Sequence, residues 1–276
     1  MRALATIILA SLLATAVACE SPIAKKAGAG LETIGLVTTP DPPAVSVDLL
    51  CDRPACNRVT LPQTLDPVLG ELARRPGSSL REWLQGEDVT ATTLVAECVS
   101  PAKDEASDTV RAAGTARFLH DARTALQQAV QPAMNAPLNT VSPIAESITK
   151  IALTPSTSAS DRRVLIILSD ARHVVIKKHQ DWECGTLPEP ETFIKGLHAE
   201  AILPPASLRG IDVLIAGAAV GPVDGGRCTF TLERASRIER LWIATLRAAG
   251  ARSIAYLPGA PTRADLDRVF ASGGSQ

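Results

Sequence analysis

Residues 162–171, RRVLIILSDA, decide which fold this chain is expected to adopt. Two arginines precede an aliphatic run from Val164 to Leu168, and Ser169 and Asp170 follow where the run stops. A short, β-branched-rich run bounded by charge is typical of a buried central strand in a parallel sheet. The polar pair then falls at the carboxyl end of the strand, where open α/β sheets bind their ligands. We therefore expect a binding site at this end of the sheet.

The composition favours one globular domain and excludes several classes of partner. The 276 residues are 46% hydrophobic and 21% charged, which is enough for one sizeable core after an export signal is removed. The formal net charge is -1 and no long basic run occurs, so we expect no nucleic-acid partner and no polybasic membrane patch. Aromatic residues make up only 3%, and Trp182 and Trp242 are predicted to be packing residues.

The first residues have the pattern of a secretory signal peptide, which we assign to residues 1–18. Their apolar run is too short to span a bilayer as a conventional helix. Residues 16–19, AVAC, resemble a bacterial lipobox, although Ala16 stands where Leu is usual. This resemblance implies lipidation of Cys19 and a membrane anchor in the cell envelope or periplasm. The same small residues also fit ordinary cleavage, which would give a secreted soluble protein. Residues 19–43 are predicted to be a flexible tether.

The rest of the chain alternates strand and helix patterns, which indicates an α/β domain over residues 44–260. We predict a doubly wound, mostly parallel sheet flanked by helices, followed by a C-terminal tail at residues 261–276. The helix expected to start at Thr64 would have Thr64 or Asp66 as its cap. Strands are predicted at 44–51, 90–99, 164–168, 210–219 and 253–257, helices at 64–75, 79–85, 102–131, 143–152 and 231–249, and an irregular excursion at 173–195.

Acidic and hydroxyl residues follow the predicted strands in a distinctive order. Asp52 ends the first strand, Ser142 and Pro143 open a mid-chain helix, and Asp170 ends the central strand. This order resembles a von Willebrand factor type A domain over about residues 44–257. In that family a divalent cation is bound by an Asp-x-Ser-x-Ser loop, a Thr of a second loop and an Asp after the central strand. The resemblance implies that Asp52, Ser142 and Asp170 are the corresponding ligands of a cation such as Mg²⁺.

The chain departs from the family pattern at the two serines of the first loop. Residues 52–56 are DRPAC, so Pro54 and Cys56 stand where the family supplies hydroxyl oxygens. Mg²⁺ requires several oxygen ligands, and a hard cation disfavours sulfur. We therefore expect a degenerate site that binds a cation weakly or not at all, and no cofactor. In the alternative, the same polar residues cap helices and hydrogen-bond the loop backbone, with Ser142 as an N-cap.

The cysteines of an exported chain tend to pair, because the compartment is oxidising. We favour a disulfide between Cys184 and Cys228, since both lie in loops that follow parallel strands and therefore share one edge of the sheet. A second candidate pair is Cys56 with Cys98. That pair would leave Cys51 as a small buried apolar residue.

No sequence motif indicates catalysis, because the chain has no G-x-S-x-G elbow, no P-loop and no G-x-G-x-x-G. We therefore predict that the protein is not an enzyme. The predicted function is an exported, lipid-anchored module that binds an unidentified protein partner at the cell envelope. The alternative is an exported hydrolase in which Asp52 and Asp170 form a paired acidic site. The two hypotheses differ in whether these residues converge around an open position beside a base or nucleophile.

Overall fold

The structure is a computed structural model of the 276-residue chain. It describes residues 41–52, 60–86, 92–102, 107–134, 142–156, 160, 162–175, 180–182, 185–217 and 231–271. The predicted signal peptide and most of the tether lie outside the described residues, as do Cys19, Pro54, Cys56, Cys184 and Cys228. Within the described part, no helix combines the length and the apolar character needed to cross a bilayer.

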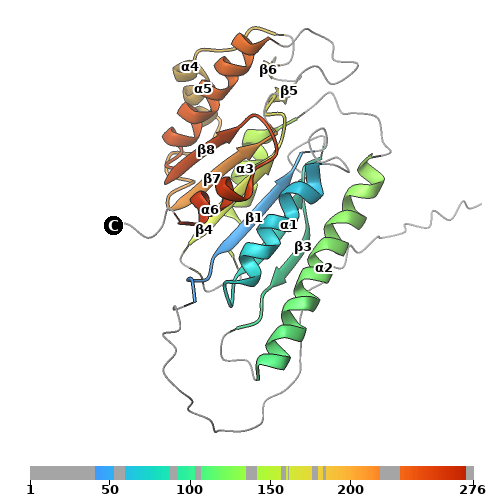
Figure 1. The fold of residues 1–276 in the computed structure, drawn as a ribbon. Helices are drawn as coiled ribbons and strands as arrows, with labels where there is room; N and C mark the ends of the chain where they lie inside the picture. Colours follow the sequence, from blue (N-terminus) through green and yellow to red (C-terminus); the bar gives the residue numbers. More distant parts are fainter. Residues whose placement is uncertain are drawn as a thin grey trace, which may run out of the picture.

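A six-stranded sheet with the order β3-β2-β1-β4-β7-β8 organises the domain (Figure 1). β3 is an antiparallel edge strand, and every other neighbouring pair is parallel. The predicted doubly wound, mostly parallel α/β fold is therefore confirmed. The strands are β1 (Ser46–Cys51), β2 (Ser79–Leu84), β3 (Thr93–Val99), β4 (Arg163–Leu168), β7 (Ile211–Ala216) and β8 (Ser253–Leu257), and a separate small sheet pairs β5 (Val174–Val175) with β6 (Gln180–Asp181).

The aliphatic run that the sequence places at the centre of the sheet forms β4, between β1 and β7. Its residues from Val164 to Leu168 are all buried. Alternate side chains of a strand point to opposite faces, and here they enter two separate hydrophobic cores. A strand covered on both faces needs an apolar residue at every position, which explains the uninterrupted run.

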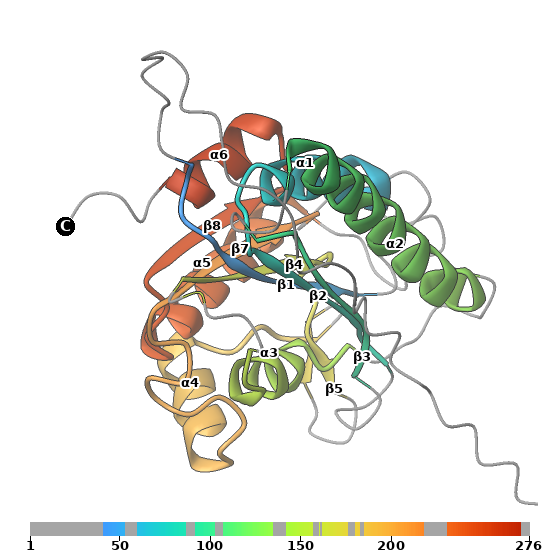
Figure 2. The same cartoon turned by 90° about the horizontal axis from the view of Figure 1, so that it is seen from below.

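Helices cover both faces of the sheet, as the view in Figure 2 shows. One layer contains α1 (Thr60–Ala73), α2 (Asp108–Met134) and α6 (Arg263–Ala271), and the other contains α3 (Ile144–Leu153), α4 (Pro190–Ala199) and α5 (Leu232–Ala248). α5 begins as predicted, because the Thr231 hydroxyl accepts a hydrogen bond from the Arg234 backbone N–H. It is closed by Gly250, whose φ of 89° lies in the left-handed region that favours glycine.

One predicted element, one predicted helix start and part of one predicted irregular segment are wrong. Residues 79–85 are not helical, because Ser79–Leu84 is paired with β1 on one side and β3 on the other. α1 begins at Thr60, so Thr64 is a buried residue inside the helix and not its cap. Helix α4 begins at Pro190, inside the segment 173–195 predicted to be irregular, and extends beyond it to Ala199. For residues 79–84, pairing with two distant strands overrides the weak local helical signal.

The predicted C-terminal tail is also wrong, because the domain extends through α6. Leu266, Val269 and Phe270 of this helix are buried in the core that α1 and α2 share with the sheet. An apolar i, i+3, i+4 spacing places the three side chains on one face of the helix. The domain therefore includes residues up to at least Ala271.

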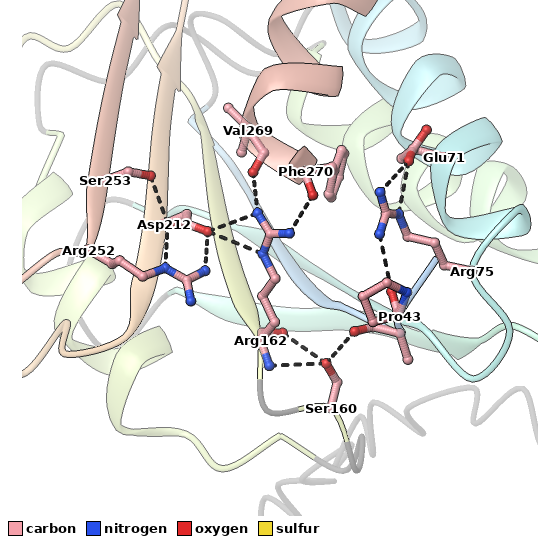
Figure 3. Close-up of polar contacts among 11 residues, drawn as sticks. Pro43, Glu71, Arg75, Ser160, Arg162, Asp212, Arg252, Ser253, Val269 and Phe270 are labelled. Atoms are coloured by element: carbon pink, nitrogen blue, oxygen red, sulfur yellow. Dashed lines mark hydrogen bonds and ion pairs between the residues drawn. The ribbon is translucent and has the colours of Figure 1, made fainter. Parts of the chain in front are cut away.

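Arg162, just before the central strand, and Arg163, its first residue, contact helices on opposite faces of the sheet. Arg163 binds Asp48 of β1 and donates to the last carbonyls of α3. Arg162 binds Asp212 of β7 and donates to the carbonyls of Val269 and Phe270 at the end of α6 (Figure 3). A cation at a helix C-terminus also interacts favourably with the helix dipole. The Arg-Arg pair therefore joins both helical layers to the amino edge of the sheet.

The Asp212 carboxylate receives further donors from β8 and its start. Arg252 forms an ion pair with it, and the Ser253 hydroxyl donates to Oδ1 at 2.7 Å (Figure 3). Burial alone would raise the pKa of Asp212, but the hydrogen bonds from Arg252 and Ser253 and the charges of Arg252 and Arg162 lower it below 3.8. The carboxylate is therefore ionised at neutral pH.

Candidate functional site at the carboxyl edge of the sheet

The strand order places a topological switch point between β1 and β4. From β1 the sheet continues through β2 and β3 in one direction, and from β4 it continues through β7 and β8 in the other. Open α/β sheets bind ligands outside the carboxyl ends of the strands at such a point. Asp52 follows β1 here, and Ser169 and Asp170 follow β4. The predicted location of the site is therefore supported by the sheet order.

The Asp52 carboxylate is the centre of a buried hydrogen-bond cluster. Its Oδ1 accepts from Gln85 Nε2 at 3.1 Å. Its Oδ2 accepts from the Ser142 hydroxyl at 3.1 Å and from the Ser169 hydroxyl at 2.6 Å. Asp52 is 3% exposed, Gln85 2%, Ser142 8% and Ser169 0%. Hydrogen bonds to the ionised form of a buried carboxylate compensate for its lost hydration.

Backbone contacts fix the segments that bring these side chains together. The Asp52 N–H donates to the Leu168 carbonyl at 2.8 Å, and the Gln85 N–H donates to the Cys51 carbonyl at 2.9 Å. Both bonds continue the parallel ladders of the sheet by one residue beyond the strand ends. Asp52, Gln85 and Ser169 therefore each follow the end of a strand, which makes the geometry of the cluster precise.

Ser142 contributes to the cluster in a way that differs from its predicted role. The N-cap of α3 is Pro143, and no side chain caps this helix. Ser142 instead forms an isolated antiparallel bridge with Val174, with backbone bonds of 2.8 Å and 3.1 Å. Its hydroxyl accepts from Gln85 Nε2 at 2.9 Å and donates to Asp52. The predicted proximity of Ser142 to Asp52 is present, and the predicted cap is wrong.

The described contacts of Asp170 are of another kind. Its Oδ1 accepts from the Arg172 backbone N–H at 3.0 Å, and its Oδ2 forms an ion pair with Arg172 Nε at 2.9 Å. The intervening Ala171 has a φ of 60°, and its N–H donates to the Ser169 hydroxyl at 2.9 Å. This tight turn places Ser169, which we did not predict as a site residue, in the Asp52 cluster. The contacts described for Asp52 and Asp170 therefore go to different groups.

The residues that line the cluster do not fit a divalent cation. Mg²⁺ binds oxygen ligands at about 2.0 to 2.1 Å in near-octahedral geometry. Around Asp52 the neighbouring groups are hydroxyl and amide donors that already direct protons at its oxygens. Within the part of the chain that the structure describes, no group of three His, Cys, Asp or Glu side chains could hold a metal ion. Pro54 and Cys56 lie outside that part.

A cluster of buried aromatic residues contacts the turn after β4. His173, Trp182, Phe193 and Trp242 are buried, and their rings meet mostly edge to face at centroid distances such as 4.9 Å between Trp182 and Phe193. The Trp242 indole donates to the Ala171 carbonyl at 2.8 Å. The prediction that both tryptophans are packing residues is confirmed, and their packing holds the left-handed turn in place.

The two described cysteines differ from their predicted roles. Cys98 is buried and carries a thiol, so the candidate pair with Cys56 is wrong. β3 runs antiparallel, and Cys98 therefore faces Leu80 near the amino edge of the sheet, away from the loop that follows β1. Cys51 is disulfide-bonded, so it is not a simple apolar residue. The Cys184–Cys228 pair lies outside the described residues and stays a prediction.

Comparisons with known proteins add a distant structural likeness. The sequence matches no protein-family model and no curated protein. Among solved structures, the chain is similar to the crystal structure of the conserved hypothetical protein BatB from Bacteroides thetaiotaomicron. The TM-score is 0.40 and the sequence identity 12%, over 84% of this chain and 98% of BatB. The fold class therefore rests on the sheet order and helix packing of this chain.

Proposed function

We propose that this protein is an exported, non-catalytic binding module that contacts a protein partner through the carboxyl edge of its sheet, in the manner of a von Willebrand factor type A domain. The observation that carries the proposal is the Asp52 cluster. One buried carboxylate joins the ends of β1, β2 and β4 and the segment before α3. Such a cluster holds the loops that leave these strands on a rigid base, and rigid scaffolds that carry loops are typical of binding surfaces.

The same contacts argue against the hydrolase. A general base must come within hydrogen-bond reach of the proton it removes. Asp52 is 3% exposed and accepts three side-chain hydrogen bonds. Asp170 forms its ion pair with Arg172. No described contact supports a paired acidic site, and binding without catalysis accounts for the arrangement with fewer assumptions.

Export and anchoring are part of the proposal. The signal-peptide pattern and the lipobox-like residues 16–19 support a lipid anchor at Cys19. The disulfide at Cys51 is in keeping with an oxidising compartment. The chain enters the sheet at Ser46, at the amino edge, and β1 runs from there toward Asp52. With an anchor at the N-terminus, the chain therefore reaches the amino edge of the sheet first and the carboxyl edge after it.

Two matched positions test whether the carboxyl edge contacts the partner. Leu232 begins α5 at this edge and is 88% exposed. Leu153 ends α3 at the amino edge and is 66% exposed. The full-length protein is expressed in its native host with a photocrosslinking amino acid in place of Leu232. Illumination should then give a discrete adduct with the partner. The same amino acid in place of Leu153 should give none. Adducts only from Leu153 would place the partner at the wrong edge and refute the proposal.

The anchor has its own test. Cys19→Ser should move the protein from the membrane fraction to the soluble envelope fraction, because the acylated cysteine is absent. A membrane fraction unchanged by Cys19→Ser would exclude the lipoprotein hypothesis and leave the binding surface untouched.

A further inference from the structure

We infer that the side-chain amide of Gln85 takes the place of a divalent cation in this site, and that this one residue makes the site independent of metal. Gln85 Nε2 donates to Asp52 Oδ1 at 3.1 Å and to Ser142 Oγ at 2.9 Å. These are two of the three residues that the sequence resemblance assigns to the cation. The amide nitrogen therefore bridges the oxygens that a metal would have to bridge.

The orientation of the amide follows from the chemistry around it. If the oxygen and nitrogen were exchanged, Gln85 Oε1 would face the Asp52 carboxylate, and two acceptors would repel each other. With the nitrogen toward Asp52, both N–H groups find acceptors. Gln85 Oε1 is then buried and has no hydrogen-bond partner among the described residues. The only metal-ligating atom of this side chain is therefore not bonded to the groups of the cluster.

The amide and the two hydroxyls supply what a cation would otherwise supply. A carboxylate that has lost its hydration needs a cation or several hydrogen-bond donors. Among the described residues, three side chains donate to Asp52, those of Gln85, Ser142 and Ser169. A cation at about 2.0 to 2.1 Å from the Asp52 and Ser142 oxygens would have to displace this amide. Gln85 is only 2% exposed, and its backbone N–H is bonded to the Cys51 carbonyl, so the residue has little room to move aside.

A single substitution should reverse this arrangement. In Gln85→Glu the amide donor is replaced by a second carboxylate of nearly the same shape beside Asp52. Two carboxylates at hydrogen-bond distance repel unless a proton or a cation lies between them. Together with the hydroxyls of Ser142 and Ser169 they present four hard oxygen groups, which suit Mg²⁺ or Mn²⁺ completed by water.

The test uses the full-length chain with Mn²⁺ and Mg²⁺ as the probes. Isothermal titration and thermal melting are measured for the natural protein, Gln85→Glu, Gln85→Met and the double variant Gln85→Glu/Asp52→Asn. For the natural protein, and separately for Gln85→Met, the melting temperature should be the same with either ion as with chelator. Gln85→Glu should melt lower in chelator, recover with Mn²⁺, and bind Mn²⁺ at least about tenfold more tightly than the natural protein. The double variant should lose that gain.

Two outcomes would overturn the inference. If the natural protein binds Mn²⁺ and its melting temperature falls on chelation, the amide does not exclude the cation. If Gln85→Glu folds and binds Mn²⁺ no better than Gln85→Met, Gln85 is not the residue that stands in the cation's place. Both measurements use purified protein, so neither outcome depends on whether a protein partner exists.

Discussion

Replacing Asp48 by Asn should be among the most damaging conservative changes in this domain. Asp48 is 1% exposed, and its carboxylate accepts from Arg81 Nε at 2.7 Å, from Arg81 Nη2 at 3.0 Å and from Arg163 Nε at 2.9 Å. The Trp83 indole donates to the same carboxylate at 2.9 Å. An amide in this place carries no charge and has one acceptor oxygen. Two guanidinium groups would then face each other at the amino edge with no counter-charge.

The expected magnitude follows from this burial. Removing one partner of a buried ion pair costs about 3 to 5 kcal/mol, because the remaining charge stays buried and unpaired. A domain is stable by only about 5 to 15 kcal/mol in total. At about 2 to 4 °C per kcal/mol for a domain of this size, the melting temperature of Asp48→Asn should fall by about 6 to 20 °C.

Thermal and urea unfolding of the full-length chain, followed by circular dichroism, measures this loss. Asp66→Asn is the matched control. The Asp66–Arg123 pair has the same 2.7 Å contact, but its side chains are 55% and 44% exposed. Exposed pairs contribute about 0.2 to 1 kcal/mol, so the control should lose little. If Asp48→Asn were no less stable than Asp66→Asn, the claim that the buried ion cluster holds the amino edge together would fail.

Three further predictions concern titration and covalent linkage. The pKa of Asp212 is lowered below 3.8, so the stability that its ionised carboxylate contributes is present above that pH and is lost as the pH falls through the folded pKa. Asp212→Asn should abolish this part of acid unfolding. An acid transition that is the same in the variant would contradict this prediction. Burial raises the pKa of Glu82 well above 4.5, so the stability that the protonated side chain contributes is present below pH 4.5 and is lost as the pH rises through the folded pKa. Glu82→Gln should therefore gain stability over the natural protein as the pH is raised, measured by urea unfolding, and a pH-independent difference would show that Glu82 is not protonated in the fold. Peptide mapping without reduction should find Cys184 linked to Cys228, and two free thiols there would remove that assignment.

The candidate site shows where local reasoning stops. Asp52 and Ser142 were predicted from their places after a strand and before a helix, and they do meet. Gln85 was missed because its segment was predicted to be helical. Had residues 79–84 been recognised as a strand, Gln85 would have followed it as Asp52 follows β1. Asp170 was assigned by the family pattern and stays a prediction, and its described contacts are with Arg172, next to the left-handed Ala171.

Features that depend on neighbouring residues could be predicted from the sequence. An uninterrupted aliphatic run indicated the buried central strand, and the pattern of residues 231–249 indicated α5, because the spacing of apolar residues along a strand or helix is a local property. The contacts of the polar residues depend instead on the tertiary fold. Ser169 meets Asp52 across 117 positions of sequence and Gln85 meets Ser142 across 57. Strand pairing and buried hydrogen bonds depend on which distant groups the fold brings within about 3 Å, and no local pattern encodes that choice.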